Sequence, residues 1–149
     1  MKRTMLMAAA MTAVSMLMTT TTASADAGEM SYKLAMQQLT PQVATFTEDV
    51  ESLTSAAMAK PELACSDEMA ELALIGASIA ADIDGAVAPS MVGFEHGKLV
   101  GTLNVLADAA ASACGQADIA AETVAGVSAE HAGWLTTISN FTAGEALSF

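Results

Sequence analysis

Apolar residues recur at intervals of three and four positions along most of the chain, which is the spacing of one face of an α-helix. Alternation of apolar and polar residues, the pattern of a half-buried strand, is absent from the sequence. Ala, the best helix former, is the most abundant residue beyond position 25. The sequence therefore predicts an all-α protein.

The first part of this pattern indicates two helices. A short leading helix is expected over residues 29–39, where apolar side chains recur four residues apart. A second helix is expected to begin at Thr40-Pro41, because Thr caps a helix well and Pro fits its first turn, and to end at Lys60-Pro61. Its predicted buried stripe consists of Val43, Phe46, Val50, Leu53 and Ala57.

The next predicted helix begins after Ser66. Ser66 is a favourable N-cap, and Asp67 and Glu68 in the first turn face the positive end of the helix dipole. The helix is expected to close at Gly85, followed by Pro89. Its predicted buried stripe consists of Met69, Leu72, Ile75, Ile79 and Ile83.

A further helix is expected from near Met91 or Phe94 to Cys114, with Gly115 where a left-handed C-terminal cap belongs. Its predicted stripe consists of Leu99, Leu103, Leu106 and Ala110. Because the loops between these helices are short, we expect an antiparallel bundle of four to five helices.

The last part of the chain is read as two short helices. Residues 118–125 are expected to form one, which Gly126 stops, and Ser128 is expected to cap another. The apolar side chains of the second are Trp134, Leu135, Ile138 and Phe141, and residues 142–149 are expected to fray.

The N-terminal residues have a different pattern. Lys2 and Arg3 precede an apolar stretch over residues 5–18, and Ala23-Ser24-Ala25 is a small-x-small cleavage site, which is typical of a secretory signal peptide. The alternative, an uncleaved membrane anchor, is disfavoured because the apolar run is shorter than the roughly 20 residues of a span. We therefore expect a signal peptide over residues 1–25 and a single exported bundle domain, periplasmic or extracellular, over residues 26–149.

The charge balance is strongly acidic, with 5 Lys+Arg against 17 Asp+Glu and a formal net charge of −12. Without the signal peptide, the basic side chains are Lys33, Lys60 and Lys98, and no Arg remains. Nucleic acids and anionic membranes need a clustered basic surface, so neither is expected as a partner. Negative charge instead attracts cationic surfaces, which favours a basic protein partner.

The two cysteines, Cys65 and Cys114, are expected to form a disulfide, because an even number of cysteines in an exported chain favours pairing. Cys65 precedes one predicted helix and Cys114 ends the next. Both helices are about 30 Å long, so an antiparallel hairpin brings the cysteines to the same end. A redox-active pair is the alternative, which the lack of a C-x-x-C motif disfavours.

No catalytic or metal-binding constellation is recognisable in the sequence. Neither His96 nor His131 has a second ligand at zinc-site spacing, so both are expected to be partly exposed structural residues. No G-x-S-x-G motif is present, and we expect a non-enzymatic protein. Asp82 and Asp84 lie near a helix end where negative charge is unfavourable, a cost that a cation or a basic partner would offset.

Two short segments, Phe94-Glu95-His96-Gly97 and Ala129-Glu130-His131-Ala132, together with Met30, resemble the small periplasmic four-helix b-type cytochromes. The resemblance implies that Met30 (or Met36) and His131 are axial ligands of haem b. The chain departs from that family in its two cysteines, its helix spacing and the lack of Arg beyond the signal peptide. A carrier of haem or of a small apolar ligand is therefore the alternative function.

Gly93, Gly97 and Gly101 recur every fourth residue and share one face of a predicted helix. One interpretation is close internal packing against another Ala-rich helix. The other is a homodimer interface or a groove for an apolar ligand, since this spacing lets a second backbone approach closely. Each Gly costs a helix up to about 1 kcal/mol relative to Ala, so we expect the three to serve a packing purpose.

Overall fold

The structure is a computed structural model that describes residues 25–144, with side chains from residue 28 onward. This part of the chain is helical and contains no strand, which confirms the all-α class. The predicted signal peptide (all but its last residue) and the segment beyond residue 144 that was expected to fray lie outside the described residues. The elements are α2 (Ala25–Ala59), η1 (Pro61–Cys65), α3 (Asp67–Asp84), η2 (Ser90–Val92), α4 (Gly93–Ala111) and α5 (Ala117–Thr142).

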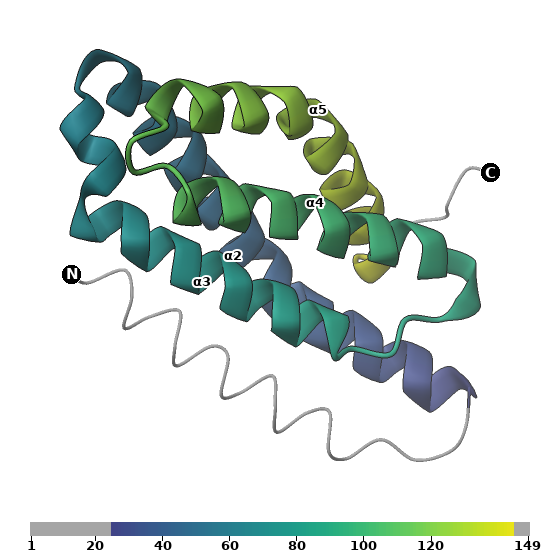
Figure 1. Ribbon diagram of the computed structural model, residues 1–149. Helices are drawn as coiled ribbons and strands as arrows, with labels where there is room; N and C mark the ends of the chain where they lie inside the picture. The colour runs from purple at the N-terminus through teal and green to yellow at the C-terminus, as the bar shows by residue number, and fades with distance from the viewer. Residues whose placement is uncertain (1–24, 145–149) are drawn as a thin grey trace.

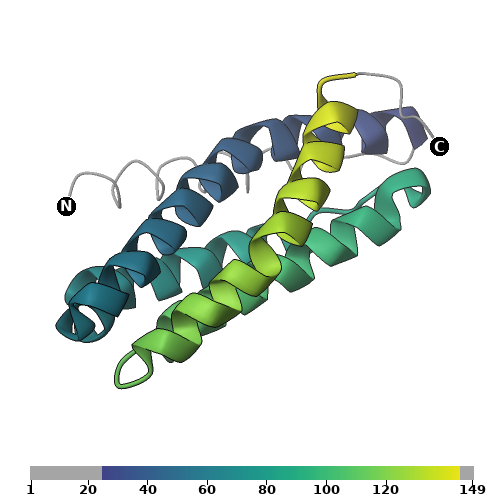
Figure 2. The same ribbon diagram turned by 90° about the horizontal axis from the view of Figure 1, so that it is seen from above.

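The four long helices form an antiparallel bundle (Figure 1). Helices α3 and α4 lie side by side as a hairpin, and α5 packs against both α2 and α4. Seen from above, α5 runs obliquely across the bundle and packs against both α4 and α2, with its end over the first part of α2 (Figure 2). Among the described residues, no helix has both the length and the apolar character that a membrane crossing requires.

Helix α2 runs without a break through Pro41, so the prediction of separate helices on either side of Thr40 is wrong. The reason is that one buried stripe continues across the proline with unchanged helical spacing. Pro41 itself is exposed, and the Gln42 side-chain amide donates to the carbonyl oxygen of Gln38, 3.1 Å away. The stripe consists of Tyr32, Ala35, Met36, Leu39, Val43, Phe46 and Val50.

Helix α5 is also continuous, so the predicted stop at Gly126 and the predicted cap at Ser128 are wrong. Gly126 is exposed within the helix, and the Ser128 hydroxyl donates to the carbonyl oxygen of Val124 at 2.7 Å. Burial along one face outweighs the helix cost of a single Gly, which is up to about 1 kcal/mol. The buried stripe consists of Ala120, Val124, His131, Ile138 and Phe141.

The predicted boundaries of α3 agree with the structure within one residue, whereas α4 ends at Ala111, three residues before the predicted end at Cys114. The Met69 backbone N–H donates to the Ser66 hydroxyl oxygen at 3.2 Å, which confirms Ser66 as the N-cap of α3. After α4, Gly115 has a φ of 77°, a left-handed conformation that favours glycine. The α3 stripe predicted from the sequence is buried except at Ile75, which is partly buried, and the α4 stripe is buried throughout.

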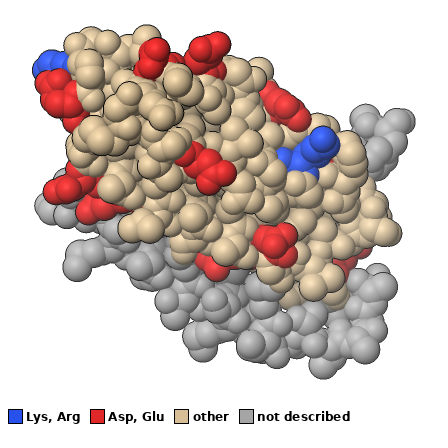
Figure 3. Space-filling view, viewed as in Figure 1, with Lys and Arg blue, Asp and Glu red and all other residues tan. Residues whose placement is uncertain are grey.

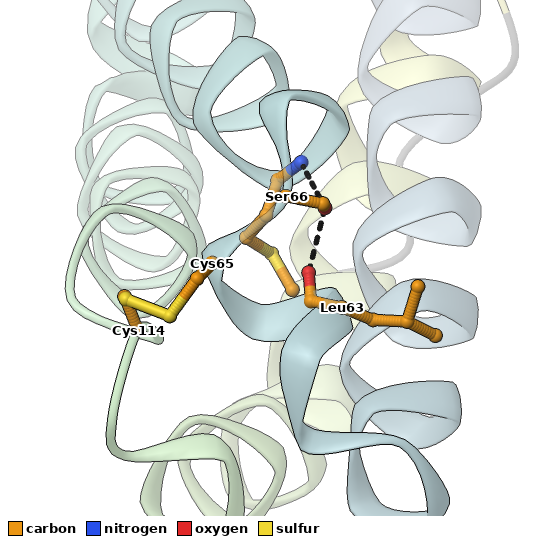
Figure 4. Close-up of a disulfide and its surroundings, with 5 residues drawn as sticks. Leu63, Cys65, Ser66 and Cys114 are labelled. Atoms are coloured by element: carbon orange, nitrogen blue, oxygen red, sulfur yellow. Dashed lines mark hydrogen bonds between the residues drawn. A yellow bond between two sulfur atoms is a disulfide. The ribbon is translucent and has the colours of Figure 1, made fainter.

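Cys65 and Cys114 form the predicted disulfide, with their Cα atoms 4.4 Å apart (Figure 4). Cys65 ends η1 between α2 and α3, and Cys114 lies between α4 and α5. The bond therefore joins two connections at one end of the bundle, which we call the stapled end (residues 60–66 and 112–116). Beside the disulfide, the Ser66 hydroxyl also donates to the carbonyl oxygen of Leu63 at 2.6 Å.

Helices α2 and α3 are in close contact where the Phe46 ring meets Gly76. Phe46 is fully buried, and a Cβ atom at Gly76 would lie 2.7 Å from Cε1 of its ring. Gly76 is thus a place where a side chain has no room, and it anchors the middle of α2 against the α3–α4 hairpin.

Candidate functional site

A surface groove of about 670 Å³ runs along α4 beside α5. Its floor includes Gly93, Gly97 and Gly101, which follow one another along α4. Apolar walls come from both helices, and one charged side chain from each helix lies at the edge. The remaining lining residues are Phe94, Lys98, Thr102, Val105, Val127 and Glu130.

The three glycines do not pack against another helix, so the prediction of close internal packing is wrong for them. All three are exposed, and a Cβ atom added at any of them would meet nothing within 4 Å. The Leu99 and Leu103 side chains occupy the inner face of α4, which turns the glycine face outward. The sequence reveals the shared face but not whether that face points inward or outward.

An aromatic pair stands at one end of the groove. The Phe94 ring is 64% exposed and meets the Trp134 ring edge-on, with centroids 5.7 Å apart. Lys98 Nζ lies 5.5 Å from the Phe94 centroid, and Trp134 Nε1 donates to a Glu130 carboxylate oxygen at 3.1 Å. The groove thus has an exposed aromatic surface next to one positive and one negative group.

Beneath the groove, Thr102 connects the surface to a buried histidine. Its hydroxyl oxygen lies 2.8 Å from Nδ1 of His131, which is fully buried in α5. Nε2 of His131 lies 2.9 Å from the hydroxyl oxygen of Thr47 in α2. His131 therefore joins three helices, with both ring nitrogens in hydrogen bonds.

The two threonines determine which protonation states His131 can adopt. The Thr47 hydroxyl lies 2.8 Å from the Val43 carbonyl oxygen, and the Thr102 hydroxyl lies 3.2 Å from that of Leu99. Neutral imidazole has one N–H, so one threonine hydroxyl accepts from the ring and the other must donate to it. Thr102 is the donor to the ring, because its hydrogen bond to a backbone carbonyl is the longer of the two and is the one given up. Burial lowers the pKa of His131, and the charge of Glu51 acts in the opposite direction, so the neutral ring is favoured.

His96 forms a second polar connection, on α4. Its Nδ1 lies 2.9 Å from the hydroxyl of Tyr32 in α2, and the ring also hydrogen-bonds to the backbone of Ile83 near the end of α3. Burial lowers the pKa of His96, while the Asp84 charge and the bond to Ile83 raise it. Burial, with the charge of Glu95, raises the pKa of Tyr32, so the phenol keeps its proton and can donate.

The prediction that both histidines are partly exposed is wrong. His96 is 8% exposed and His131 is 0% exposed, and both contribute hydrogen bonds between helices. A signal for His131 was present in the sequence. It lies seven residues after Val124 and seven before Ile138, at a core position of α5.

The structure does not bring together the ligands that the cytochrome resemblance implies. Met30 is 65% exposed near the start of α2, whereas His131 contacts α2 at Thr47, about 25 Å further along the helix. Met36 is buried, but it precedes Thr47 by about 16 Å on the same helix. Both nitrogens of His131 are already hydrogen-bonded, so these residues do not form a haem ligand set in this structure.

The acidic pair near the end of α3 does not form a metal-binding cluster. No group of three or more His, Cys, Asp or Glu side chains within residues 28–144 is arranged to hold a metal ion. Asp84 is exposed, whereas Asp82 is half-buried with its Oδ2 buried and without a hydrogen-bond partner. Burial raises the pKa of Asp82.

Comparisons with known proteins do not place the chain in a family: no family model, no curated protein and no solved structure matches it. The fold itself defines the class, a disulfide-linked all-α helical bundle.

Proposed function

We propose that this protein is exported and acts as a non-enzymatic binding protein for a basic protein partner, with the α4–α5 groove as the contact surface. The observation that carries the proposal is the charge of the surface. Acidic groups are spread over the face shown in Figure 3, and basic groups are rare there. The exposed carboxylates of the described residues are Glu48, Glu51, Glu62, Asp67, Glu68, Asp84, Asp108, Asp118, Glu122 and Glu130.

Few cations oppose these carboxylates. Lys33 is partly buried and lies 3.2 Å from a Glu29 carboxylate oxygen on the same helix. Within the described residues, the exposed lysines are Lys60 and Lys98. A surface of this kind steers cationic proteins toward it and repels anionic ones, and salt screens both effects.

Two features support export. The sequence has the charged, apolar and small-residue regions of a signal peptide over residues 1–25. The Cys65–Cys114 disulfide is a bond that persists in oxidising compartments and is rare in the cytosol. The mass of the protein from an exported fraction tests this point, because cleavage after Ala25 leaves a chain that begins at Asp26.

The shape of the groove suits a helix as the occupant. The glycine floor lets a second backbone come close to α4, and Phe94 and Val105 provide apolar contact area beside it. Glu130 at the edge offers a carboxylate to a Lys or Arg on that helix. A second copy of this chain is a poorer occupant, because beyond residue 25 each copy carries three Lys against 17 Asp+Glu and the two copies repel each other.

The lone tryptophan gives a direct test of this proposal. Trp134 touches Phe94 at the end of the groove, so its fluorescence reports on occupancy. We expect a Lys/Ala amphipathic helical peptide to shift the emission, with an affinity that falls as salt rises from about 20 mM to about 500 mM. A matched Glu/Ala peptide should have no effect. Failure of the Lys/Ala peptide to bind would contradict the proposed function.

A Gly97→Leu substitution tests the position of the contact. The Cβ site is open and Leu is a better helix former, so the variant should be more stable by up to about 1 kcal/mol, yet its side chain fills the groove. Gly133→Leu is the matched control, since Gly133 is also exposed and open but does not line the groove. We expect Gly97→Leu to weaken peptide binding at least tenfold, about 1.4 kcal/mol, and Gly133→Leu to leave it unchanged.

Two other results would redirect the proposal. Equal binding by Gly97→Leu and the native protein would place the contact outside the groove. Concentration-dependent sedimentation as a dimer, strengthened by salt and abolished by Gly97→Leu, would make a second copy the occupant.

A further inference from the structure

The N-terminal part of α2, residues 25–40, is joined to the bundle differently from the rest of that helix. We call this segment the α2 arm. Its inner face is buried through Tyr32, Ala35, Met36 and Leu39. Pro41 follows directly and has no N–H to bond the carbonyl four residues earlier, so the helix lacks one backbone hydrogen bond where the arm meets the rest of α2.

Side chains of three residues in the described part of the arm, Tyr32, Lys33 and Gln37, make polar or ring contacts with other helices. The Tyr32 hydroxyl bonds His96 on α4 at 2.9 Å, and the Gln37 amide donates to the carbonyl oxygen of Thr142 at the end of α5 at 2.8 Å. Lys33 Nζ lies 4.8 Å from the centroid of the Phe141 ring. Of these groups, His96 is the one whose charge changes between about pH 5 and pH 8.

The direction of the Tyr32–His96 hydrogen bond follows from the second contact of His96. A neutral imidazole has one N–H, and the contact with the Ile83 backbone raises the pKa of His96, which is the effect of a carbonyl oxygen that accepts from the ring. Nδ1 is therefore an acceptor, and the Tyr32 hydroxyl is the donor. The arm is thus held through a lone pair on Nδ1 that exists only while His96 is neutral.

We propose that the Tyr32–His96 contact is an acid-released latch, and that the α2 arm opens about Pro41 when His96 takes up a proton. A proton from solvent binds the Nδ1 lone pair, and the ring becomes a cation. Nδ1–H and the Tyr32 O–H are then two donors that face each other in a buried space. The hydroxyl must turn so that its oxygen accepts from Nδ1–H, and its own proton then loses the acceptor it had in the neutral pair. The buried ring also becomes charged, and both changes weaken the closed arm.

Charged groups near the latch come from several helices. On α3, Asp82 and Asp84 flank Ile83, and the charge of Asp84 favours protonation of His96. Glu95 precedes His96 on α4, and Lys33 follows Tyr32 on α2. Helix α5 contributes the uncharged Phe141 ring, 6.1 Å from the Tyr32 ring between centroids.

The sign of the pH dependence follows from burial. Burial lowers the pKa of His96 when the arm is closed, whereas the exposed imidazole of the open form has a pKa near 6.5. The closed arm is therefore fully stable above about pH 6.5 and loses stability as the pH falls from there to the lower pKa of the closed form. Below that pKa, no further loss comes from His96.

His131 provides an internal comparison, because its surroundings differ. Both threonine hydroxyls beside its ring have a backbone carbonyl within reach, Val43 for Thr47 and Leu99 for Thr102. If both nitrogens carried protons, both hydroxyls could still accept from the ring and donate to the backbone. Protonation of His131 therefore leaves each threonine hydroxyl with an acceptor, whereas protonation of His96 takes away the nitrogen to which the Tyr32 hydroxyl donates.

Hydrogen exchange followed by mass spectrometry on the whole disulfide-bonded protein tests the latch. Protection is compared at pH 7 and pH 5 after correction for the intrinsic exchange rate. We expect protection of residues 28–40 to fall severalfold at pH 5, with residues 67–84 unchanged, because exchange reports even rare opening. Equal protection at the two pH values, or an equal loss in every helix, would overturn the proposal.

Two variants assign the effect to His96. His96→Gln keeps an acceptor and a donor but does not titrate, so the ratio of protection between the two pH values should return to one, whatever the variant's stability. His131→Gln is the matched control and should keep the acid step. Tyr32→Phe should lower protection of the arm already at pH 7 and reduce the change at pH 5. An acid step that survives His96→Gln but is lost in His131→Gln would contradict the assignment.

Discussion

The two ends of the bundle are held together by different chemistry. At the stapled end, the Cys65–Cys114 bond joins the α2–α3 connection to the α4–α5 connection (Figure 4). At the opposite end, which we call the latched end, the α2 arm, the α3–α4 connection and the end of α5 meet. There the described connections are hydrogen bonds and ring contacts, such as those of Tyr32 and Gln37.

The difference shows how one end of a bundle can stay linked at any pH while the other end changes its stability with pH. Helices α3 and α4 are each about 27 Å long and separate the two ends, so a change at one need not reach the other. A covalent bond is insensitive to pH, whereas a histidine lone pair disappears when it is protonated. The α2 arm can therefore open at the latched end while the disulfide at the stapled end keeps the helices in register.

The largest effect is expected from removal of the disulfide. The double substitution Cys65→Ser and Cys114→Ser frees a loop with a sequence separation of 49, which should lower the free energy of unfolding by about 4 kcal/mol. Urea unfolding followed by circular dichroism measures the loss. The native protein with its disulfide reduced is the control and should match the variant. An unchanged unfolding midpoint would mean that the staple does not stabilise the fold.

A smaller effect is expected from Tyr32→Phe at the latched end. The variant keeps the ring contacts but leaves Nδ1 of His96 buried without its donor, which should cost about 1–3 kcal/mol. Thr45→Val is the matched control, because the exposed Thr45 hydroxyl bonds only its own helix at Pro41 and its loss should be close to neutral. If urea unfolding gives the same loss of unfolding free energy for both variants, the Tyr32–His96 hydrogen bond does not stabilise the contact between α2 and α4.

The smallest change is expected from Asp82→Asn, with the opposite sign. Burial raises the pKa of Asp82 above its unfolded value, so the ionised carboxylate destabilises the fold at neutral pH. The variant should be slightly more stable at pH 7, and the gain should disappear as the pH falls and Asp82 in the native protein takes up a proton. Unfolding midpoints at pH 7 and pH 4 measure this. A variant less stable at pH 7 would show that the Asp82 charge has a favourable partner.

Much of the bundle could be predicted from the sequence because its signals are local. Ser66, Gly115 and the stripe from Leu99 to Ala110 each depend on neighbours a few residues away. The disulfide followed from two such local predictions together with helix length. The breaks predicted at Pro41 and Gly126 failed because packing of a continuous apolar stripe outweighs the local preference of one residue.

The groove and the latch could not be predicted in the same way. Which face of α4 points outward depends on how α5 packs, so the exposure of Gly97 is a tertiary property. Tyr32 and His96 are separated by 64 positions, and no local pattern links them. The protonation contrast between His96 and His131 depends on backbone carbonyls that become available only in the folded helices.

The central claim is that the two ends of the bundle respond independently. The most direct test perturbs one end at a time and measures hydrogen exchange at both ends. Hydrogen exchange is measured on the native protein at pH 7, at pH 7 with the disulfide reduced, and at pH 5 with the disulfide intact. We predict that reduction lowers protection mainly around residues 60–66 and 112–116, and that acid lowers it mainly in residues 28–40. Loss of protection at both ends under either perturbation would contradict the account, because the bundle would then respond as one cooperative unit.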